Sequence, residues 1–254
     1  MKLSVITINY NNCDGLRKTI ESVVNQTCRD FEYIIIDGGS TDGSVDVIKQ
    51  YADKIDYWVS EPDKGIYNAM NKGIAVAHGE YLNFMNSGDC FYDCSSIAEF
   101  LNLQANEDIV FGNMVDSYTG KQMGCISSDN ITAADFLNAS LPHQASFIRR
   151  ILFEKYGLYD EKYKIASDWK FFLYVIVFMN VSLRHIDKNF ATFENFGIST
   201  SNHTAERDAI INELFPPRII ADYSFALSLR DVYKSKLCRI LYSFLYRISS
   251  LTRK

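Results

Sequence analysis

The sequence predicts an α/β protein with a mostly parallel central sheet flanked by helices. In the first half of the 254-residue chain, short β-branched apolar runs alternate with segments of helical periodicity. The runs are apolar throughout, as strands covered on both faces are. Loops rich in turn-forming residues follow them. Repeated strand–helix–strand units of this kind build parallel sheets through right-handed crossovers.

Each element of the first half has its own signal. Val, Ile and Tyr are frequent in the strand segments, and the helical segments repeat apolar residues three and four positions apart. The expected strands cover residues 3–8, 31–36, 55–59 and 81–85. The expected helices cover residues 16–24, 45–51 and 66–77.

The second half is less regular. Strands are expected over residues 108–111, 122–126 and 143–148. A short helix is expected over 133–139, and another begins at Asp168. The apolar run Phe171–Met179 in that second helix is about half the roughly 20 residues that a membrane span needs. We therefore interpret it as a buried helix.

The end of the chain differs in charge from the rest. Between Leu229 and Lys254 there are seven Lys or Arg residues and one Asp, a net charge of +6, whereas the whole chain carries −5. The apolar residues of this tail follow the 3.6-residue period of a helix. A basic amphipathic helix after an acidic body predicts contact with an anionic membrane surface, and packing on the parent domain or on a partner is the alternative. We expect a main domain over residues 1–215 and a helical, basic amphipathic extension over 216–254.

Composition and missing motifs exclude several classes of protein. The net charge of −5 argues against a nucleic-acid binder, which is usually basic. Neither the G-x-G-x-x-G of dinucleotide-binding folds nor the G-x-x-x-x-G-K-[ST] phosphate loop is present. The amino terminus enters a strand pattern without a signal-peptide organisation, and the six Cys residues form no C-x-x-C pair. These features predict a cytoplasmic protein with reduced cysteines.

Polar residues gather after four of the expected strands. The clusters lie at Asn9-Tyr10, Asp37–Asp42, Glu61–Lys64 and Ser87–Asp89. Any one of them is an ordinary polar loop. Parallel strands, however, bring their carboxyl ends to one edge of the sheet, where ligands bind in this class of fold. Their joint placement therefore predicts a ligand site at this edge.

Two carboxylates at this edge suit a nucleotide and a metal ion. Asp37 can accept a hydrogen bond from the imide N–H of a uracil or from a ribose hydroxyl, and Tyr10 can flank the base. The glycines after Asp37 let the chain approach a flat base closely. Asp89 can bind a hard divalent cation such as Mg²⁺ or Mn²⁺, which completes its shell with substrate phosphates. The alternative for both aspartates is helix capping or turn formation.

Five longer motifs carry a resemblance to a known family. Ser4–Asn11, Tyr33–Gly43 and Gly79–Asp89 resemble the matching segments of family 2 glycosyltransferases, which have the GT-A fold. Ser22–Thr27 is similar to the same family, and Glu61–Gly73 resembles a subgroup that takes part in bacterial surface-polysaccharide synthesis. The resemblance is dense up to about residue 115 and sparser up to about residue 200.

The resemblance implies an inverting hexosyltransferase. Its donor would be a nucleotide-diphosphate sugar, most commonly a UDP-sugar, and its acceptor a glycan or a lipid-linked glycan. Its cofactor would be divalent Mn²⁺ or Mg²⁺. It would act as a peripheral protein at the inner face of the cell membrane, in agreement with the basic tail. By the same resemblance, the donor-binding residues are Asn9, Tyr10, Asp37, Asp63, Lys64 and Ser87.

The metal ligand and the general base follow from the same resemblance. Asp89 ends the segment that matches the family's D-x-D metal motif, which here reads Ser87-Gly88-Asp89 and supplies one carboxylate instead of two. The segment Ala166–Trp169 resembles the family's base motif, with Ser167 in place of a Glu, so the role of general base falls to Asp168 alone. The alternative for Asp168 is an N-cap of the following helix.

The acceptor side is expected in the second half of the chain. His143-Gln144 resembles a motif of related transferases near the acceptor side, and a structural role for His143 is the alternative. Trp169 is assigned to the same side. Asn195–Ser199 resembles a Gly-Gly-x-Ser segment of the family, with Phe196 in place of the first Gly. We expect that segment to shape an acceptor loop.

Two other functions remain as alternatives. A sugar nucleotidyltransferase shares a similar sheet, but it would carry a Gly-rich basic loop after the first strand, where this chain has Asn9–Asn12. A non-catalytic sugar-nucleotide-binding protein needs no base, so that alternative predicts that Asp168→Asn keeps full function.

Overall fold

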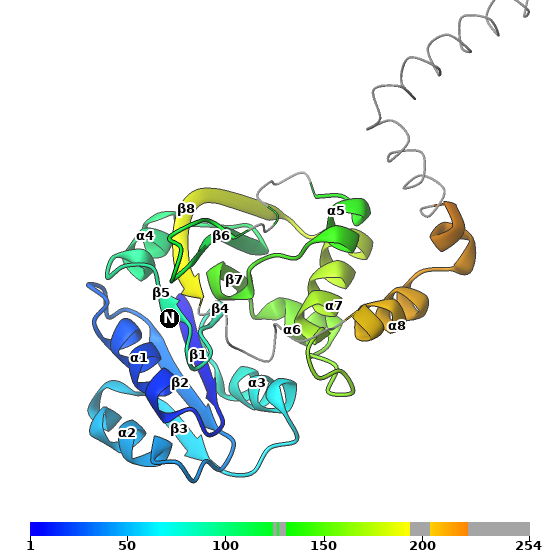
Figure 1. Ribbon diagram of the computed structural model, residues 1–254. Helices are drawn as coiled ribbons and strands as arrows, with labels where there is room; N and C mark the ends of the chain where they lie inside the picture. Colours follow the sequence, from blue (N-terminus) through cyan, green and yellow to red (C-terminus); the bar gives the residue numbers. More distant parts are fainter. Residues whose placement is uncertain (124–125, 127–130, 194–203, 223–254) are drawn as a thin grey trace, which may run out of the picture. The chain divides into compact units, whose positions relative to one another are not determined.

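The computed structural model describes residues 1–123, 126, 131–193 and 204–222 (Figure 1). It divides the chain into two compact units, Met1–Glu206 and Arg207–Lys254. The described part of the first unit contains an eight-stranded sheet in the order β3-β2-β1-β4-β7-β6-β8-β5. Helices flank this sheet, so the expected α/β class is confirmed.

The first half of the chain forms the parallel side of the sheet. Its strands are β1 (Leu3–Asn9), β2 (Glu32–Asp37), β3 (Tyr57–Ser60) and β4 (Tyr81–Phe84). Its helices are α1 (Cys13–Val24), α2 (Ser44–Gln50) and α3 (Ile66–Val76), with a short 3-10 turn, η1 (Ala52–Lys54), before β3. Strand β1 pairs in parallel with β2 and β4, and β2 pairs in parallel with β3. Each expected element of this half is therefore present, with bounds that differ by a few residues.

The two faces of these strands are covered by different helices. Val5 and Ile35 belong to the core cluster that includes the buried residues of α1 and α2. On the opposite face, α3 lies so close to the strands that a Cβ on Gly73 would sit 2.5 Å from Ile6 Cγ2 and 3.6 Å from Ile36 Cγ1. Right-handed crossovers require this arrangement, because the chain moves one way from β1 to β3 and then returns past β1 to β4. The sheet therefore has a topological switch point between β1 and β4.

The chain after β4 adds strands of mixed direction. Its strands are β5 (Cys90–Phe91), β6 (Ile109–Asp116), β7 (Ser146–Arg149) and β8 (Leu183–Phe193). Its helices are α4 (Ser96–Asn102), α5 (Ala133–Asn138), α6 (Ile151–Tyr156), α7 (Ser167–Leu173) and α8 (Thr204–Leu214). Strand β7 runs antiparallel to both β4 and β6, whereas β8 runs parallel to β6. The parallel order predicted from the first half therefore ends at β4.

Three expectations for the second half need correction. The strand predicted to begin at His143 begins at Ser146, because a 3-10 turn, η2 (His143–Ala145), precedes it. Pro142 O accepts hydrogen bonds from Ala145 N at 3.0 Å and from Ser146 Oγ at 2.8 Å, and these bonds close the turn. The helix predicted up to Met179 ends as α7 at Leu173 and continues as a π-helical turn, η3 (Tyr174–Phe178). The described residues of the segment 122–126 do not form the predicted strand. Gln122 makes an isolated bridge with Val115 instead.

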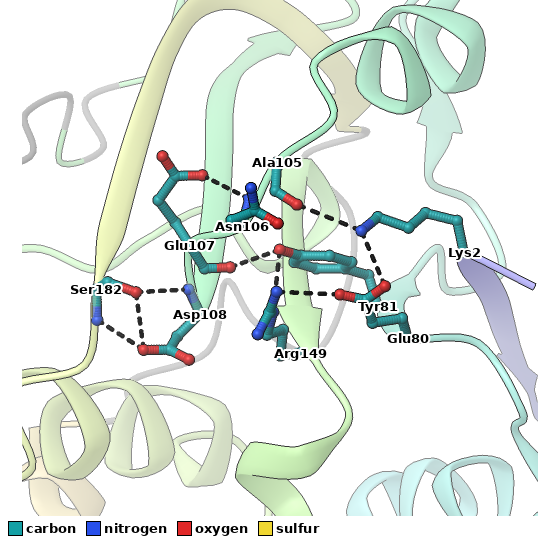
Figure 2. Close-up of polar contacts among 9 residues, drawn as sticks. All are labelled: Lys2, Glu80, Tyr81, Ala105, Asn106, Glu107, Asp108, Arg149 and Ser182. Carbon is teal, nitrogen blue, oxygen red and sulfur yellow. Dashed lines mark hydrogen bonds and ion pairs between the residues drawn. The ribbon is translucent and has the colours of Figure 1, made fainter.

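A polar network joins the amino ends of β1, β4 and β6 (Figure 2). The Tyr81 hydroxyl donates to Glu107 O at 2.6 Å and accepts from Arg149 Nε at 3.2 Å. Glu80 pairs with Lys2 at 2.8 Å and with Arg149 at 3.1 Å. These contacts fasten the end of the sheet that lies opposite the predicted ligand site.

Two predicted segments, the tail helix over 229–254 and the loop Asn195–Ser199, lie outside the described residues. In the part of the chain that the structure describes, no helix has both the length and the apolar character needed to cross a bilayer.

Candidate active site

The predicted site residues of the first half lie at the carboxyl ends of the parallel strands, and Asn9, Ser87 and Asp89 lie at the switch point between β1 and β4. Asn9 ends β1 and is paired in register with Asp37, which ends β2. The turn Asn86–Asp89 follows β4 and is held to β1 by a hydrogen bond from Ser87 N to Ile8 O at 3.0 Å. Ligands of open α/β sheets bind at this place, beyond the carboxyl ends of the strands.

Asp37 is fully buried, and four uncharged donors surround its carboxylate. Asn9 Nδ2 donates at 2.7 Å, Ser40 Oγ at 2.6 Å, Ser40 N at 2.9 Å and Ser60 Oγ at 2.6 Å. Burial alone would raise the pKa of Asp37, but the hydrogen bonds from Ser40, Ser60 and Asn9 outweigh burial and hold the pKa below its ordinary value. Asp37 is therefore an ionised carboxylate in neutral solution.

Tyr10 and Asp63 flank Gly38, the residue after Asp37. A Cβ on Gly38 would collide with Asp63 Oδ2 and would lie 3.2 Å from Tyr10 Cδ2. Tyr10 is 65% exposed, so its ring is open to solvent beside this glycine. Lys64 is also exposed, and its backbone N–H donates to Asn68 Oδ1 at 3.1 Å. The predicted donor residues Tyr10 and Asp63 are thus brought together at the surface above Asp37.

The turn after β4 is fixed against α1. The Thr19 hydroxyl donates to Asp89 O at 2.7 Å and accepts from Gly88 N at 2.9 Å. Asn12 Nδ2 donates to Ser87 O at 3.1 Å. Gly88 has a φ of 104°, a left-handed conformation that favours glycine. The positions of Ser87 and Asp89 are therefore set by α1 as well as by β4.

Asp168 lies in the first turn of α7, and its two carboxylate oxygens contact different parts of the fold. The Tyr67 hydroxyl, from α3, donates to Oδ1 at 2.7 Å. His143 Nδ1 lies 3.3 Å from Oδ2. Burial raises the pKa of Asp168, but the hydrogen bonds from His143 and Tyr67 and the charge of His143 outweigh burial and lower it. The side chain is 17% exposed, so this ionised carboxylate can still be reached from solvent.

His143 and Gln144 connect Asp168 with the turn after β4. Burial lowers the pKa of His143, but the carboxylates of Asp168 and Asp89 outweigh burial and raise it. The other ring nitrogen, Nε2, lies 3.4 Å from Asn86 Nδ2. Gln144 Nε2 donates to Asp89 Oδ2 at 3.2 Å. The 3-10 turn before β7 therefore joins the predicted base and the predicted metal ligand in one cluster.

Trp169 lies in the core beneath this cluster. It is 2% exposed, and its indole N–H donates to the carbonyl oxygens of Phe136 at 3.0 Å and Ala139 at 3.1 Å. These bonds tie α7 to the end of α5. Trp169 thus supports the helix that carries Asp168.

Several residues of the site were not assigned a role from the sequence. They are Ser40, Ser60, Tyr67 and Asn86. Ser40, Tyr67 and Asn86 lie within the motifs that resemble the family, whereas Ser60 does not. The motifs therefore mark three of these positions, but they do not show which residues the side chains contact. Tyr67 and Asp168 are 101 residues apart in the chain, and a single sequence has no feature that pairs them.

The oxygen donors near Asp89 suit a hard divalent ion. Among the described residues, no three His, Cys, Asp or Glu side chains form a metal-binding group. Asp89 and Ser87 put a carboxylate and a hydroxyl on one turn, and Mg²⁺ and Mn²⁺ prefer oxygen ligands. With few protein ligands, such an ion would take its other oxygens from water and from phosphates of the substrate. These residues therefore fit a metal that is bound together with the donor.

Solved structures share this fold. S. aureus TarS superposes with a TM-score of 0.65 at 19% identity, over 76% of this chain and 37% of that chain. TarS 1-349 in complex with UDP-GlcNAc gives 0.65 at 19% identity, over 81% of this chain and 61% of that one. Mannosyltransferase PcManGT from Pyrobaculum calidifontis, in complex with GDP-Man and Mn²⁺, gives 0.61 at 14% identity, over 98% and 80%. The predicted GT-A fold is thereby confirmed.

Sequence relatives identify the family. A PGL/p-HBAD biosynthesis glycosyltransferase of Mycobacterium bovis (strain BCG / Pasteur 1173P2) is 30% identical over 203 residues, 76% of this chain and 77% of that protein. An uncharacterized glycosyltransferase of Mycobacterium tuberculosis (strain CDC 1551 / Oshkosh) is 38% identical over 179 residues, 67% of each chain. Residues 4–152 match the family model described as glycosyl transferase family 2. The chain therefore belongs to glycosyltransferase family 2, and it is an enzyme of the glycosyltransferase class.

Proposed function

We propose that this enzyme is an inverting hexosyltransferase that moves a sugar from a UDP-sugar to a glycan or lipid-linked acceptor in surface-polysaccharide synthesis. The observation that carries the proposal is the cluster around Asp168. Its ionised carboxylate is linked through His143 to the turn after β4, and Gln144 in the same segment contacts Asp89. The proposed base, Asp168, and the proposed metal ligand, Asp89, are thus connected through His143 and Gln144 at the carboxyl end of the sheet.

The proposed step is a single displacement at the anomeric carbon. Asp168 takes the proton of the acceptor hydroxyl while that oxygen forms a bond to C1 of the sugar. The bond between C1 and the diphosphate oxygen breaks, and its electron pair leaves with the nucleotide. Asp168 is ionised at neutral pH, because its pKa lies below the ordinary value, and its carboxylate can therefore accept the proton.

We assign the nucleoside of the donor to Asn9, Tyr10 and Asp37. The four hydrogen bonds to Asp37 fill the acceptor positions of a carboxylate. Serine hydroxyls rotate, so either Ser40 or Ser60 can give way to an imide N–H of the base. The exposed ring of Tyr10 supports this assignment because it offers a flat surface beside Gly38.

We assign the diphosphate end of the donor to Asp63, Lys64, Ser87 and Asp89. The exposed Lys64 supplies a positive charge on the loop that leads into α3. Asp89 would hold Mn²⁺ or Mg²⁺, and such an ion, when bound, stabilises the charge that builds up on the leaving diphosphate. The PcManGT complex with GDP-Man and Mn²⁺, which shares the fold, supports this assignment.

We assign the acceptor to the side of Asp168 that His143 and Gln144 border, with Trp169 supporting that side from the core.

We also propose that the basic tail holds the enzyme peripherally at the inner face of the cell membrane. The net charge of +6 between Leu229 and Lys254 supports this location. Sedimentation with vesicles that contain anionic lipid tests it: a chain ending at Ser228 should stay in the supernatant, and equal sedimentation of both chains would contradict the proposal.

A donor screen and one substitution test the proposed reaction. Thermal shift with UDP-, GDP- and dTDP-sugars, each with and without Mn²⁺, selects the donor, because binding stabilises the folded state by RT ln(1 + [L]/Kd). With that donor, Asp168→Asn should lower the transfer rate by about 10²- to 10⁴-fold. Donor affinity measured by calorimetry should stay near wild type.

Asp160→Asn provides the matched control. Asp160 is also close to α7, but its carboxylate pairs with Lys170 at 2.7 Å and with Lys162 at 3.5 Å. The control variant should keep the wild-type rate. A fully active Asp168→Asn enzyme would rule out Asp168 as the base.

A further inference from the structure

We propose that Tyr67 is a positioning residue for catalysis, whose hydroxyl holds the Asp168 carboxylate in the orientation that receives the acceptor proton. This inference rests on the proposed function, since it assigns to Tyr67 a task in the step that Asp168 performs. The base resemblance names only the segment Ala166–Trp169, whereas Tyr67 lies on α3, in the other half of the chain.

The contact is direct, and its geometry is well defined. The Tyr67 hydroxyl lies 2.7 Å from Asp168 Oδ1 and 2.5 Å from Ile165 O, and its ring is buried. One O–H supplies one proton, which can be shared between these two acceptors. Burial and the nearby Asp168 charge raise the pKa of Tyr67 well above its ordinary value, so the hydroxyl keeps its proton. Tyr67 is thus a permanent donor that orients the carboxylate without competing for its proton.

Other residues of α3 hold the segment that leads to Asp168. Asn71 Nδ2 donates to Tyr159 O at 2.9 Å, and Asn71 Oδ1 accepts from Tyr159 N at 3.0 Å. Asn68 Nδ2 donates to Glu161 Oε2 at 3.0 Å. Tyr67, Asn68 and Asn71 lie on one face of the helix, because positions three and four apart are neighbours there. This face of α3 is therefore a polar seam against residues 159–168.

The same helix is joined to the loop assigned to the donor. Lys72 Nζ lies 2.7 Å from Glu61 Oε1 and donates to Pro62 O at 3.1 Å. Asp63 Oδ1 accepts from Gly65 N at 2.8 Å, directly before α3 begins. The loop 61–65 and the carboxylate of Asp168 are thus both attached to α3. A hydroxyl on this helix can align the base with the donor.

The test compares two tyrosines of the same cluster. Tyr67→Phe removes the hydroxyl that contacts Asp168. Tyr159→Phe removes a buried hydroxyl that has no hydrogen-bond partner among the described residues, from a ring whose centroid is 5.6 Å from that of Tyr67. The two changes are chemically identical, but Tyr67→Phe also loses the hydrogen bonds to Asp168 Oδ1 and Ile165 O. The readout is the release of UDP from the UDP-sugar chosen by thermal shift, which requires no acceptor other than water.

We expect Tyr67→Phe to lower kcat about ten- to a hundredfold, the usual effect of a hydrogen bond to a charged group, with the donor KM unchanged. The acid limb of the kcat profile should move to higher pH, because the ionised carboxylate loses a donor. Among the described residues, the titratable groups that interact with Asp168 are Tyr67, His143 and Tyr159, and Tyr67→Phe alters the first of them alone. Tyr159→Phe should behave as wild type. A wild-type kcat and acid limb in Tyr67→Phe, or an equal loss in Tyr159→Phe, would overturn the inference.

A second replacement keeps both hydrogen bonds of the hydroxyl. With 3-fluorotyrosine at position 67, the more acidic hydroxyl is a stronger donor, so the acid limb should move to lower pH, and an unmoved limb counts against the inference. In the Asp168→Asn background, Tyr67→Phe should cause no further loss, and an additional loss of similar size overturns the inference. Full activity of Asp168→Asn alone would instead contradict the proposed function. A failure of the inference about Tyr67 can therefore be distinguished from a failure of the proposed function.

Discussion

The two ends of the sheet hold their charges in different ways. At the amino ends of the strands, carboxylates pair with cations: Glu80 contacts both Lys2 and Arg149, whose side chains are 32% and 26% exposed. At the carboxyl ends, Asp37 is fully buried and receives its four hydrogen bonds from uncharged groups. Asp168 is held by a tyrosine hydroxyl and a histidine.

The difference shows that the carboxyl end of the sheet preserves the negative charge of a carboxylate. A lysine or arginine partner offsets the charge of a carboxylate throughout the neutral pH range, whereas the neutral donors around Asp37 hold that carboxylate in place and leave its negative charge. Asp168 lies between these two cases, because its histidine partner carries a charge only when it is protonated. The energetic consequence is also different, because exposed ion pairs contribute little to stability and buried carboxylates are costly to leave without donors. Substitutions at the two ends should therefore differ in size, and the largest effect is expected at Asp37.

Asp37→Ala should destabilise the protein most. The change leaves donors of Asn9, Ser40 and Ser60 without their acceptor, and we expect a loss on the order of 3 kcal/mol in the free energy of unfolding. Urea unfolding measures it. Since the pKa of Asp37 is lowered on folding, its contribution is present above pH 3.8, the ordinary pKa, and is lost as pH falls through the lowered value.

Asp42→Ala is the control for that change. Asp42 lies on the same loop and accepts three hydrogen bonds, from Cys13 N, Ser44 N and Ser44 Oγ, but it is exposed. Water can replace its contacts, so the loss should be clearly smaller. Equal losses in the two variants would show that burial does not distinguish Asp37.

His143→Gln should have an intermediate effect that depends on pH. The His143 pKa is raised on folding, so its contribution is complete below 6.5, the ordinary value, and is lost as pH rises through the raised value. The pKa of Asp168 is lowered on folding, so the stabilising contribution of the His143–Asp168 pair is lost in acid only below pH 3.8. The stability difference from wild type, on the order of 1 kcal/mol, should therefore be largest near pH 5 and shrink in alkali.

Melting temperatures of both proteins between pH 4 and 9 provide the measurement. His185→Gln is the control, because His185 Nε2 contacts the amide oxygen of Asn113, Oδ1, at 3.1 Å. A difference for His143→Gln that does not change with pH would mean that the ring acts by packing alone.

Glu80→Gln should have the smallest effect. It removes the half-exposed ion pairs with Lys2 and Arg149, and we expect a loss of less than about 1 kcal/mol that disappears in high salt. The transfer rate should equal that of wild type. A reduced rate would mean that the two ends of the sheet are coupled and do not act independently.

The parallel half of the fold could be predicted because its signals are local. Every residue of β1 and β2 is buried, so each strand shows as a run of apolar or small polar residues, apart from Glu32 and Asp37 at the two ends of β2. Strand β8 is different, because Asp187 and Lys188 lie exposed in its middle and its register with β6 shifts there. Strand β5 has two residues and depends on pairing with Ala191 and Thr192. Such strands are defined by distant partners, which no short segment reveals.

The site could be predicted in part for the same reason. Asp37 and Asp89 follow strands, so their meeting at one edge is a consequence of parallel order. The role of Asp168 came from a motif, and its contacts with Tyr67 and His143 bridge 101 and 25 residues of chain. The 3-10 turn that presents His143 also looked like a strand, because Pro142 closes it through a carbonyl that the sequence does not distinguish.

The polar seam of α3 has a consequence for the order in which the molecule is assembled. Its bonds to Tyr159 and Asp168 close loops of 88 and 101 residues, whereas the paired residues of β1 and β2, and of β2 and β3, lie at most 28 residues apart. Long loops lose more chain entropy on closure, so we expect these bonds to form late in folding. A chain that has completed only its first half would then possess the edge proposed to face the nucleotide, without the proposed base Asp168. On this proposal, activity is gained only when the two parts of the chain meet.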